Sequence, residues 1–298
     1  MRAALAATGD EHDRRLHGLH DSLPLAALRD RSVPAHRLGD VAGRSVLLAV
    51  ADQLTAALAL IALDGVARRI TLCPPDLPPA QLPAIARNAP AQVVICERDA
   101  DLPEIGGMDH VIRCAASLDR DIGPSSAALS SEWILLTSGT TGLPKLVRHT
   151  LASLLAPIKP APARGEPVVW STFYDIRCYG GLQIFLRAIV GGGSLVLSNA
   201  AEATGAFLGR AGACGVTHIS GTPSHWRRAL MSPQAHRIRP RYVRLSGEIA
   251  DQALLDQLRQ SYAPAGVGHA FASTEAGVAF EVERAHGGVR HRRRPFGQ

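Results

Sequence analysis

Short runs typical of β-strands alternate with longer amphipathic segments along this 298-residue chain, and no other feature constrains its fold as much. Such alternation is typical of a mainly parallel sheet with helices on both faces. Apolar residues at helical spacing around Leu182 and Leu254 predict two of the helices. The sequence therefore predicts an α/β fold. We expect strands at residues 46–50, 69–73, 92–96, 132–137, 168–171, 194–197, 216–219 and 242–245.

A turn-rich stretch at residues 122–131, with Gly123, Pro124 and several serines, divides the predicted elements into two groups. The chain is long enough for one large or two medium domains. We expect both groups to form doubly wound, mainly parallel lobes. The predicted organisation is an irregular or partly helical lead-in at 1–39, a first α/β lobe at 40–121, a second at 130–281 and a disordered basic tail at 282–298.

The composition indicates a globular protein, with 46% hydrophobic and 19% charged residues. Asp52 and Gln53 interrupt the longest apolar stretch, residues 46–63, so a core strand followed by a core helix fits better than a membrane span. No secretory signal is visible, and the five cysteines lack C-x-x-C spacing, which indicates reduced thiols. We expect a cytoplasmic protein without a membrane partner.

The formal charge of +6 raises the question of nucleic-acid binding. The arginines are concentrated at 237–244 and 290–294, and no aromatic residues interleave with them as a single-strand platform would require. We therefore interpret them as a solvated surface and a basic end, and we expect no nucleic-acid partner. A basic surface would also suit an anionic nucleotide.

The most informative motif is a loop of hydroxyl and glycine residues that follows an apolar strand and ends in a lysine. The glycines let consecutive backbone N–H groups converge on an oxyanion, the hydroxyls add donors, and the lysine adds a positive charge. This pattern predicts a phosphate-binding loop. Its residues are Thr137, Ser138, Gly139, Thr140, Thr141, Gly142, Leu143, Pro144 and Lys145.

The loop differs from the Walker motif of P-loop nucleotide hydrolases. That motif requires G-x-x-x-x-G-K-S/T, whereas Lys145 stands three residues after Gly142 and no hydroxyl residue follows it. Ordinary P-loop ATPase or kinase chemistry is therefore disfavoured. The loop resembles instead the signature of the adenylate-forming superfamily, which includes acyl- and aryl-CoA ligases, peptide-synthetase adenylation domains and luciferases. The resemblance covers about residues 40–280.

Two further motifs resemble parts of the nucleotide site of this superfamily. Ser246, Gly247 and Glu248 follow a predicted strand and resemble the turn that contacts adenine. A second element, 269–277, resembles the aromatic-G-x-T-E-x-G motif. The resemblance assigns nucleotide contacts in this element to His269, Phe271, Ala272 and Thr274.

The second element implies specific roles and contains two departures from the family pattern. Phe271 would lie on the adenine, Thr274 would bond the α-phosphate, and Glu275 would hold Mg²⁺ between phosphate oxygens, as a hard cation prefers. Together with Lys145, Thr274 and Glu275 are the catalytic residues implied by the resemblance. Phe271 replaces the usual tyrosine, and Ala272 replaces the usual glycine.

Residues 171–193 correspond loosely to the family's segment along the acid-binding tunnel. Asp175 is one candidate for gripping a substrate amine, although the downstream helix places Tyr179 closer to that position, and a packing role for Asp175 is equally compatible. Residues 217–226 resemble another tunnel wall. There we expect His225 and Trp226 to pack rather than to catalyse.

The resemblance implies an AMP-forming acid–thiol ligase that activates a small carboxylic acid as acyl-AMP. It further implies ATP and Mg²⁺ as cofactors, and CoA or a carrier protein as the acceptor. The family continues with a ribose-binding aspartate, a hinge and a small domain carrying a catalytic lysine, none of which is visible here. We therefore expect a truncated ligase of reduced activity or, alternatively, a non-catalytic nucleotide- or acyl-binding remnant.

Overall fold

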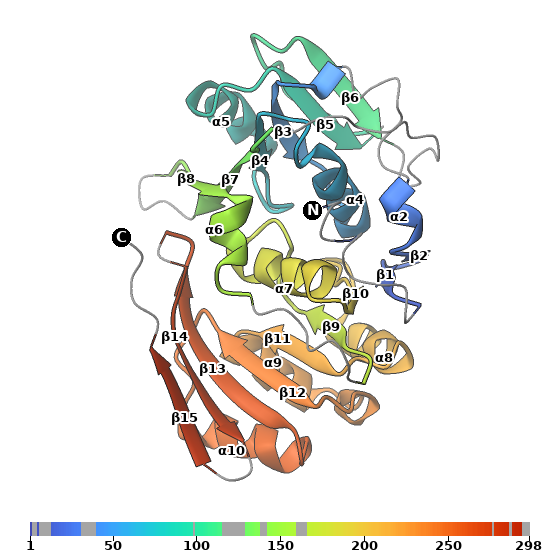
Figure 1. Ribbon diagram of the computed structural model, residues 1–298, viewed down its shortest axis with the longest axis vertical. Coiled ribbons are helices and arrows are strands. Elements are labelled where there is room, and N and C mark those ends of the chain that lie inside the picture. Colours follow the sequence, from blue (N-terminus) through green and yellow to red (C-terminus); the bar gives the residue numbers. More distant parts are fainter. Residues whose placement is uncertain are drawn as a thin grey trace. The chain divides into compact units, whose positions relative to one another are not determined.

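The computed structural model describes residues 1, 5, 13–30, 40–97, 99–114, 129–137, 142–158, 166–275, 277–285 and 288–293 (Figure 1). The chain divides into two compact units. Unit 1 comprises Met1–Asp13, Leu23–Ala156 and Ile176–Cys178, and unit 2 comprises Arg14–Ser22, Pro157–Asp175 and Tyr179–Gln298. Among the residues just given, no helix combines the length and the apolar character needed to cross a bilayer.

Unit 1 is built on a six-stranded sheet in the order β6-β5-β3-β4-β7-β8, in which only the β7–β8 pair is antiparallel. Its strands are β3 (Ser45–Ala49), β4 (Arg69–Leu72), β5 (Val93–Glu97), β6 (His110–Cys114), β7 (Glu132–Thr137) and β8 (Lys145–Thr150). The helices include α2 (Ala27–Asp30), α4 (Gln53–Leu63), α5 (Leu82–Asn88) and α6 (Leu151–Leu155), with a 3₁₀ turn at Pro79–Gln81.

The strand order of unit 1 places its two main helices on opposite faces of the sheet. The connection from β3 through α4 reaches β4 on one side, whereas the connection through α5 returns across β3 to β5. Because such crossovers are right-handed, α4 and α5 cover different faces. Leu47 and Val94 pack with Ile85 of α5 in one buried cluster, and every residue of α4 is buried. The unit is therefore doubly wound, as predicted.

Unit 2 is built on a nine-stranded sheet in the order β15-β14-β13-β12-β11-β9-β10-β1-β2. The pairs from β1 through β10, β9, β11 and β12 to β13 are parallel, and β14 and β15 are antiparallel additions. The strands are β1 (Arg15–His17), β2 (Ser22–Pro24), β9 (Val169–Thr172), β10 (Ser194–Val196), β11 (His218–Gly221), β12 (Tyr242–Ser246), β13 (Gly266–Ser273), β14 (Gly277–Ala285) and β15 (Gly288–Arg293).

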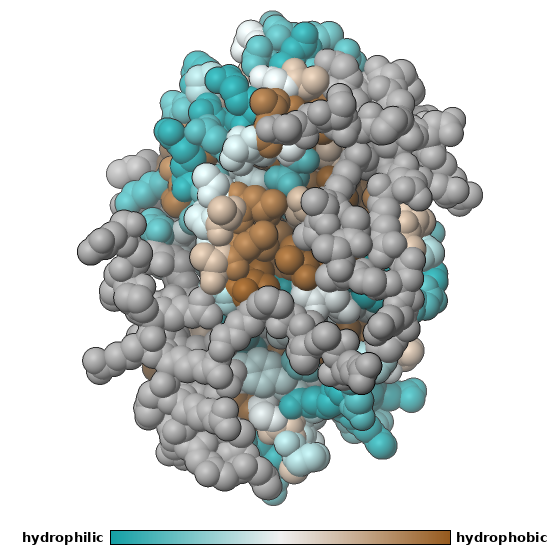
Figure 2. Space-filling view, viewed as in Figure 1, coloured by the Kyte–Doolittle hydropathy of each residue, from teal (hydrophilic) through white to brown (hydrophobic). Residues whose placement is uncertain are grey.

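The helices of unit 2 also cover both faces of its sheet. They are α7 (Tyr179–Val190), α8 (Thr204–Ala213), α9 (Pro223–Met231) and α10 (Gln252–Ser261), with a 3₁₀ turn at Ala235–Arg237. The crossover through α7 runs in the opposite direction to those through α8, α9 and α10, which places α7 on the other face. Phe207, Trp226 and Leu258, one from each of the latter helices, share a core with Val243 and Leu245 of β12. In Figure 2, hydrophobic residues gather over the position of α7.

The predicted α/β class is confirmed, and every predicted strand is present with ends shifted by at most about two residues. Two boundary predictions differ from the structure. Residues 132–137 were placed in the second lobe, but β7 pairs with β4, with Ile70 opposite Trp133, and so belongs to the sheet of unit 1. The unit boundary accordingly falls between Ala156 and Pro157.

The predictions for the two ends of the chain are corrected by strand pairing. Within the predicted lead-in, β1 pairs with β10, so that Leu16 lies opposite Leu195. Within the predicted disordered tail, the end of β14 and all of β15 form an antiparallel pair next to β13. Composition predicts a disordered tail at residues 282–298, but at 282–285 and 288–293 strand pairing provides partners for backbone hydrogen-bonding groups whatever the charge of these residues.

Candidate functional site

The predicted phosphate loop connects two antiparallel strands at one edge of the unit 1 sheet. Thr137 ends β7, Lys145 begins β8, and the two residues are register partners. A strand follows the loop, whereas a Walker loop leads into a helix, which agrees with the sequence argument against that motif. Ser138, Gly139, Thr140 and Thr141 lie outside the described residues.

The strand that leads into this loop is firmly anchored. Glu132 at the start of β7 accepts two hydrogen bonds on Oε2 from Arg69 of β4, at 2.8 Å from Nε and 2.6 Å from Nη2. The hydrogen bond from Arg69 lowers the pKa of Glu132 more than any other interaction. Trp133 is fully buried, and its Nε1 donates to Asp64 Oδ1 at 3.3 Å. The loop therefore begins from a fixed position.

Gly142 and Lys145 mark the far side of the loop. Gly142 has φ of +90°, a conformation that favours glycine, and no atom lies within 4 Å of the position of a Cβ. Its carbonyl accepts a hydrogen bond from Gln81 Nε2 at 3.2 Å. Lys145 is exposed, and no ion pair joins it to another residue in the described segments. The two residues thus leave backbone and charge accessible to an anion.

The second predicted motif lies at the carboxyl end of β12 in unit 2. Ser246 is the last residue of that strand and is buried. The Tyr174 hydroxyl donates to Ser246 O at 2.6 Å and lies 3.0 Å from Ser246 Oγ. Burial raises the pKa of Tyr174 to about 12, so the hydroxyl stays protonated near neutral pH. Tyr174 therefore fixes the strand end from which the turn starts.

The turn after Ser246 is held on its other side by the first turn of α9. Gly247 has φ of +84°, and a Cβ there would meet Thr222 Cγ2 at 3.5 Å and Tyr174 Oη at 3.6 Å. The Glu248 carboxylate accepts from the Ser224 backbone N at 3.0 Å and from Ser224 Oγ at 2.6 Å. The hydrogen bond from the Ser224 side chain is the largest cause of the lowered pKa of Glu248. Glu248 is thus an ionised group that already has protein partners.

The third predicted motif lies beside the second because β12 and β13 are parallel neighbours. Leu245 lies opposite His269, and Ser246 lies opposite Ala270. His269 Nε2 donates to the carbonyl oxygen of Glu248 at 3.0 Å, which ties the turn to the next strand. Phe271 is 58% exposed, which is unusual for a large aromatic residue. An exposed ring next to a tight turn can accept a flat heterocycle by stacking.

Thr274 and Glu275 lie at the end of this motif, in the turn between the antiparallel strands β13 and β14. Ser273 and Gly277 are the last register partners before the turn, and Glu275 is exposed. The β13–β14 register shifts between Phe271 and Ala272. Within the described segments, no three His, Cys, Asp or Glu residues cluster to hold a metal ion. A metal held by Glu275 would therefore need most of its ligands from a substrate or from water.

Most side chains of the predicted acid-tunnel segments pack in the protein interior. Trp226 is fully buried in the core of unit 2, and its Nε1 donates to Arg244 O at 3.3 Å, as expected for a packing residue. His225 Nδ1 accepts from Thr222 N at 3.1 Å and so completes the N-terminal cap of α9. Tyr179 begins α7 and is buried, whereas Asp175 is half-buried.

The structure thus brings Ser246, Gly247, Glu248, His269 and Phe271 together within unit 2. Thr137, Gly142 and Lys145 belong to unit 1 and are described only there. Sequence reasoning did not find the contacts that Tyr174 and Ser224 make with the turn. The Tyr174–Ser246 hydrogen bond joins residues 72 positions apart, and the Ser224–Glu248 bond joins residues 24 positions apart. A local sequence pattern cannot predict contacts between residues so far apart in the chain.

Comparison with known proteins bears on the family and the fold of this chain. The sequence profile of the AMP-binding enzyme family matches residues 36–297. The anthranilate CoA ligase AuaEII, solved in complex with anthranoyl-AMP, is 15% identical with a TM-score of 0.78, over 97% of this chain and 61% of that chain. The NpsA N-terminal subdomain of Klebsiella oxytoca in complex with 3-hydroxyanthranilyl-AMSN is 17% identical with a TM-score of 0.71, over 99% and 77%.

A third similar structure is the AMPPNP-bound form of the nonribosomal peptide synthetase FmoA3 (S1046A). It is 13% identical with a TM-score of 0.75, over 97% of this chain and 33% of that chain. This chain therefore spans about three quarters of the subdomain structure, less than two thirds of the ligase and a third of the synthetase. At these identities the likeness concerns the fold. A search of curated protein sequences finds no match.

Proposed function

Because this chain belongs to the AMP-binding enzyme family, we propose that it binds Mg-ATP and activates a carboxylic acid as acyl-AMP. The observation that carries the proposal is the parallel pairing of β12 with β13. This pairing sets Ser246 opposite Ala270 and allows His269 to hold Glu248, with the exposed Phe271 close by. The predicted adenine turn and the predicted aromatic motif are thus neighbours in space although they are separate in sequence.

The base would lie between the turn and the aromatic ring. Gly247 carries no side chain, so an adenine edge can approach the backbone closely, and Phe271 offers the face for stacking. The Tyr174 and Ser224 hydrogen bonds keep the turn in place before the ligand arrives. Such preorganisation lowers the entropic cost of binding.

Two elements would contribute contacts to phosphate, each within its own unit: the loop that ends at Lys145 in unit 1 and the β13–β14 turn in unit 2. Lys145 supplies an exposed positive charge that can follow the leaving pyrophosphate, and Thr274 supplies a hydroxyl donor to the α-phosphate. Glu275 would hold Mg²⁺ together with phosphate oxygens and water, which suits a cation that usually takes only one or two protein carboxylates. Bound there, Mg²⁺ would neutralise developing charge on the phosphates.

In the proposed reaction, a carboxylate oxygen of the acid attacks the α-phosphorus of ATP. The new bond joins that oxygen to phosphorus, the bond from the α-phosphorus to the β-phosphate bridging oxygen breaks, and pyrophosphate leaves with the electron pair. The protein acts by positioning and by stabilising charge rather than through a covalent nucleophile. The acyl-AMP would then pass its acyl group to the thiol of CoA or of a carrier protein: the bond from the acyl carbon to sulfur forms, the bond from that carbon to the phosphate oxygen breaks, and AMP leaves.

The complexes of similar structures suggest aromatic acids as the first substrates to test. AuaEII was solved with anthranoyl-AMP, and NpsA with 3-hydroxyanthranilyl and 3-hydroxybenzoyl analogues. We therefore propose a panel of anthranilate, 3-hydroxyanthranilate and 3-hydroxybenzoate, with straight-chain fatty acids as the comparison class.

Isothermal titration of Mg-ATP into the wild type and Lys145→Ala tests nucleotide binding. We expect the variant to bind roughly tenfold or more weakly, because a charge-assisted contact to phosphate is lost. Arg148→Ala is the matched control: Arg148 is an exposed cation on the same strand, three residues away and therefore on the opposite face of β8. Equal weakening by both substitutions would contradict a specific role for Lys145.

Exchange of labelled pyrophosphate into ATP in the presence of each acid tests catalysis. Acid-dependent exchange that Lys145→Ala and Glu275→Gln reduce would support the ligase proposal. Mg-ATP binding without exchange for any acid would favour the alternative predicted from the sequence, a non-catalytic nucleotide-binding protein. Failure to bind Mg-ATP would overturn the proposal itself.

A further inference from the structure

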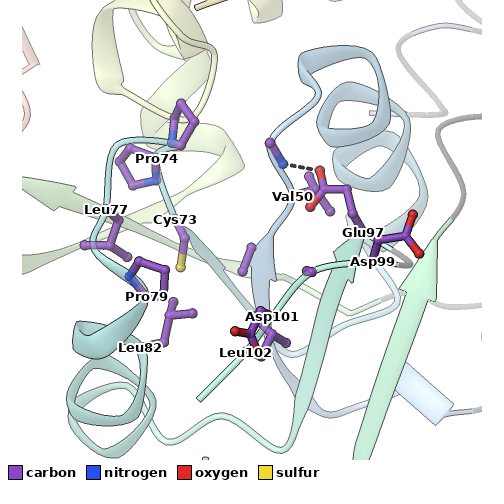
Figure 3. Close-up of a pocket in the computed structure, with 14 residues that line it drawn as sticks. Val50, Cys73, Pro74, Leu77, Pro79, Leu82, Glu97, Asp99, Asp101 and Leu102 are labelled. Atoms are coloured by element: carbon purple, nitrogen blue, oxygen red, sulfur yellow. Dashed lines mark hydrogen bonds between the residues drawn. The ribbon is translucent and has the colours of Figure 1, made fainter.

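Unit 1 contains a pocket of about 530 Å³ that no part of the proposed nucleotide site uses (Figure 3). Most of its lining residues end or follow three neighbouring parallel strands: Ala49, Val50 and Ala51 at β3, Cys73, Pro74, Pro75 and Leu77 after β4, and Glu97, Asp99, Ala100, Asp101 and Leu102 at β5. Leu82 of α5 completes one wall. This volume falls in the usual range for small-molecule sites.

The pocket lies where the topology of an open α/β sheet favours a ligand site. From β3 the chain crosses to β4 on one side and then to β5 on the other, so the loops after these strands diverge. Crevices at the carboxyl ends of strands, at such a change of direction, are the common ligand positions in this architecture. Position and volume therefore both indicate a binding site.

The backbone donors that would bind an anion here are already used by the protein. Glu97 Oε1 accepts hydrogen bonds from the backbone N of Ala51 and, at 3.1 Å, of Asp52. Asp52 Oδ2 accepts from Thr55 N at 2.7 Å and caps α4. Two carboxylates thus occupy the strand-to-helix turn where phosphates usually bind in α/β proteins. An anionic ligand would find these donors taken and negative charge in their place.

The remaining lining divides into an apolar side and an acidic side. Leu77 and Pro79 lie on one side of the pocket in Figure 3, and Glu97 and Asp99 lie on the other. Asp101 adds a third carboxylate, whereas no lysine or arginine is among the lining residues of the described segments. Two arginines donate to backbone carbonyls of lining residues: Arg113 Nη1 to Ala100 O at 2.8 Å and Arg177 Nη2 to Ala51 O at 3.0 Å.

Cys73 forms part of the pocket without adding charge. Burial raises the pKa of its thiol to about 12, although a nearby positive charge on Arg177 acts in the opposite direction. The thiol is therefore neutral near physiological pH and contributes to the apolar surface. The charged side chains among the described lining residues are the carboxylates of Glu97, Asp99 and Asp101.

We propose that this pocket binds a small organic cation, an ammonium group carried on an apolar body. The apolar part would pack against Leu77, Pro79 and Leu82, and the ammonium would face the acidic side of the pocket, to which Asp99 and Asp101 belong. Neither aspartate takes part in a hydrogen bond or ion pair recorded within the described segments, so both carboxylates can pair with a ligand. The proposal concerns unit 1 alone and does not depend on the proposed ligase activity.

The test compares 2-phenylethylammonium with 2-phenylethanol, a neutral ligand of similar size, by titration into the full chain. We expect the cation to bind at least about fivefold more tightly, and this preference to fall as salt is added. In Asp99→Asn/Asp101→Asn the preference should disappear, and both substitutions are conservative changes at exposed positions. Asp76→Asn is the matched control, because Asp76 is exposed in the same region and does not line the pocket.

A pocket-filling variant, Ala100→Phe, separates the pocket from general surface attraction. We expect it to weaken binding of both ligands, whereas a merely electrostatic surface effect would leave them unchanged. Equal affinity for alcohol and ammonium, a preference that survives the double substitution, or no binding of the cation would each overturn the proposal. Mg-ATP titration of the same variants reports on the nucleotide site, so either proposal can fail alone.

Discussion

At the scale of single residues, the turn after β12 is held in place by hydrogen bonds between polar groups of the protein. Tyr174 donates to Ser246, Ser224 donates to Glu248, and His269 donates to the Glu248 carbonyl. A buried acceptor that loses its donor costs more free energy than the net gain from forming the bond. Single substitutions around this turn should therefore have measurable effects.

Tyr174→Phe keeps the ring and removes the hydroxyl that holds Ser246. We expect the free energy of unfolding to fall by about 1–2 kcal/mol, because the Ser246 carbonyl is left without this donor. We also expect Mg-ATP to bind more weakly, since the turn is no longer fixed. Urea denaturation and isothermal titration measure the two effects.

Tyr262→Phe is the control for this substitution. The Tyr262 hydroxyl also donates to a backbone carbonyl, Ala235 O at 3.3 Å, and burial likewise raises its pKa to about 12. We expect a comparable loss of stability of about 1 kcal/mol without a change in nucleotide affinity. Similar loss of affinity in both variants would show that the effect of Tyr174 is general destabilisation.

The lowered pKa of His218 predicts how the free energy of unfolding depends on pH. Burial, with a further contribution from Arg241, lowers its pKa from 6.5 to about 4. Between these values the unfolded chain binds more protons than the folded protein, so the free energy of unfolding falls as pH decreases from 6.5 towards 4. His218→Gln should make this slope shallower in urea titrations at a series of pH values. Burial also lowers the pKa of His225, so part of the slope should remain in His218→Gln. A slope equal to that of the wild type would show that His218 is not a source of the pH dependence.

At the scale of elements, the junction between β3 and α4 shows how a polar pair can stand inside an apolar stretch. Asp52 accepts from Thr55 N at 2.7 Å and caps α4, and Gln53 Oε1 accepts from the backbone N of Ile176 at 3.0 Å. Both residues therefore satisfy buried backbone donors. The interruption that argued against a membrane span is the start of a core helix.

Asp52→Ala should lower the free energy of unfolding by about 0.5–2 kcal/mol, the usual effect of losing a helix N-cap. Asp52→Asn should retain most of the stability, because an amide oxygen can accept the same bond. Urea denaturation followed by circular dichroism distinguishes the two variants. If alanine and asparagine behaved alike, the cap would not be the source of the stability.

Strands could be predicted from the sequence where they are buried and therefore consist mainly of apolar residues. The central strands β3, β4, β5 and β7 are apolar runs buried along most of their length, and all were found. The edge strands β6 and β8 are partly exposed and carry polar residues, so their apolar pattern is weak. Their existence depends on a neighbouring strand that offers backbone partners, which local sequence does not reveal.

The candidate site follows the same rule. The phosphate loop could be predicted from its own glycine and hydroxyl residues, and the positive φ of Gly142 agrees with that argument. The turn at Ser246 and the element at 269–277 were predicted from their resemblance to family motifs. The supporting contacts of Tyr174, Ser224 and Gln81 could not be predicted, since each comes from a different element. The roles assigned to Lys145, Thr274 and Glu275 remain predictions.

At the scale of the whole molecule, two sheets each have a hydrophobic core of their own. Leu47 is fully buried in the core cluster that includes α5 in unit 1, and Leu245 is fully buried in the cluster beneath α8, α9 and α10 in unit 2. Units with separate cores can open separately, each with its own free energy. We therefore expect the two units to differ in how hydrogen exchange responds to a destabilising substitution in one of them.

Leu47→Ala and Leu245→Ala form a matched pair that tests this division. Each deletes the same atoms from a fully buried position in a central strand, and we expect each to cost about 2–5 kcal/mol. In hydrogen exchange measured by mass spectrometry, Leu47→Ala should lose protection mainly in β3, β4 and β5, and Leu245→Ala mainly in β11, β12 and β13. The reason is that a cavity destabilises the cooperative unit that contains it. Equal loss of protection across both units, from either substitution, would show that the chain opens as one cooperative body.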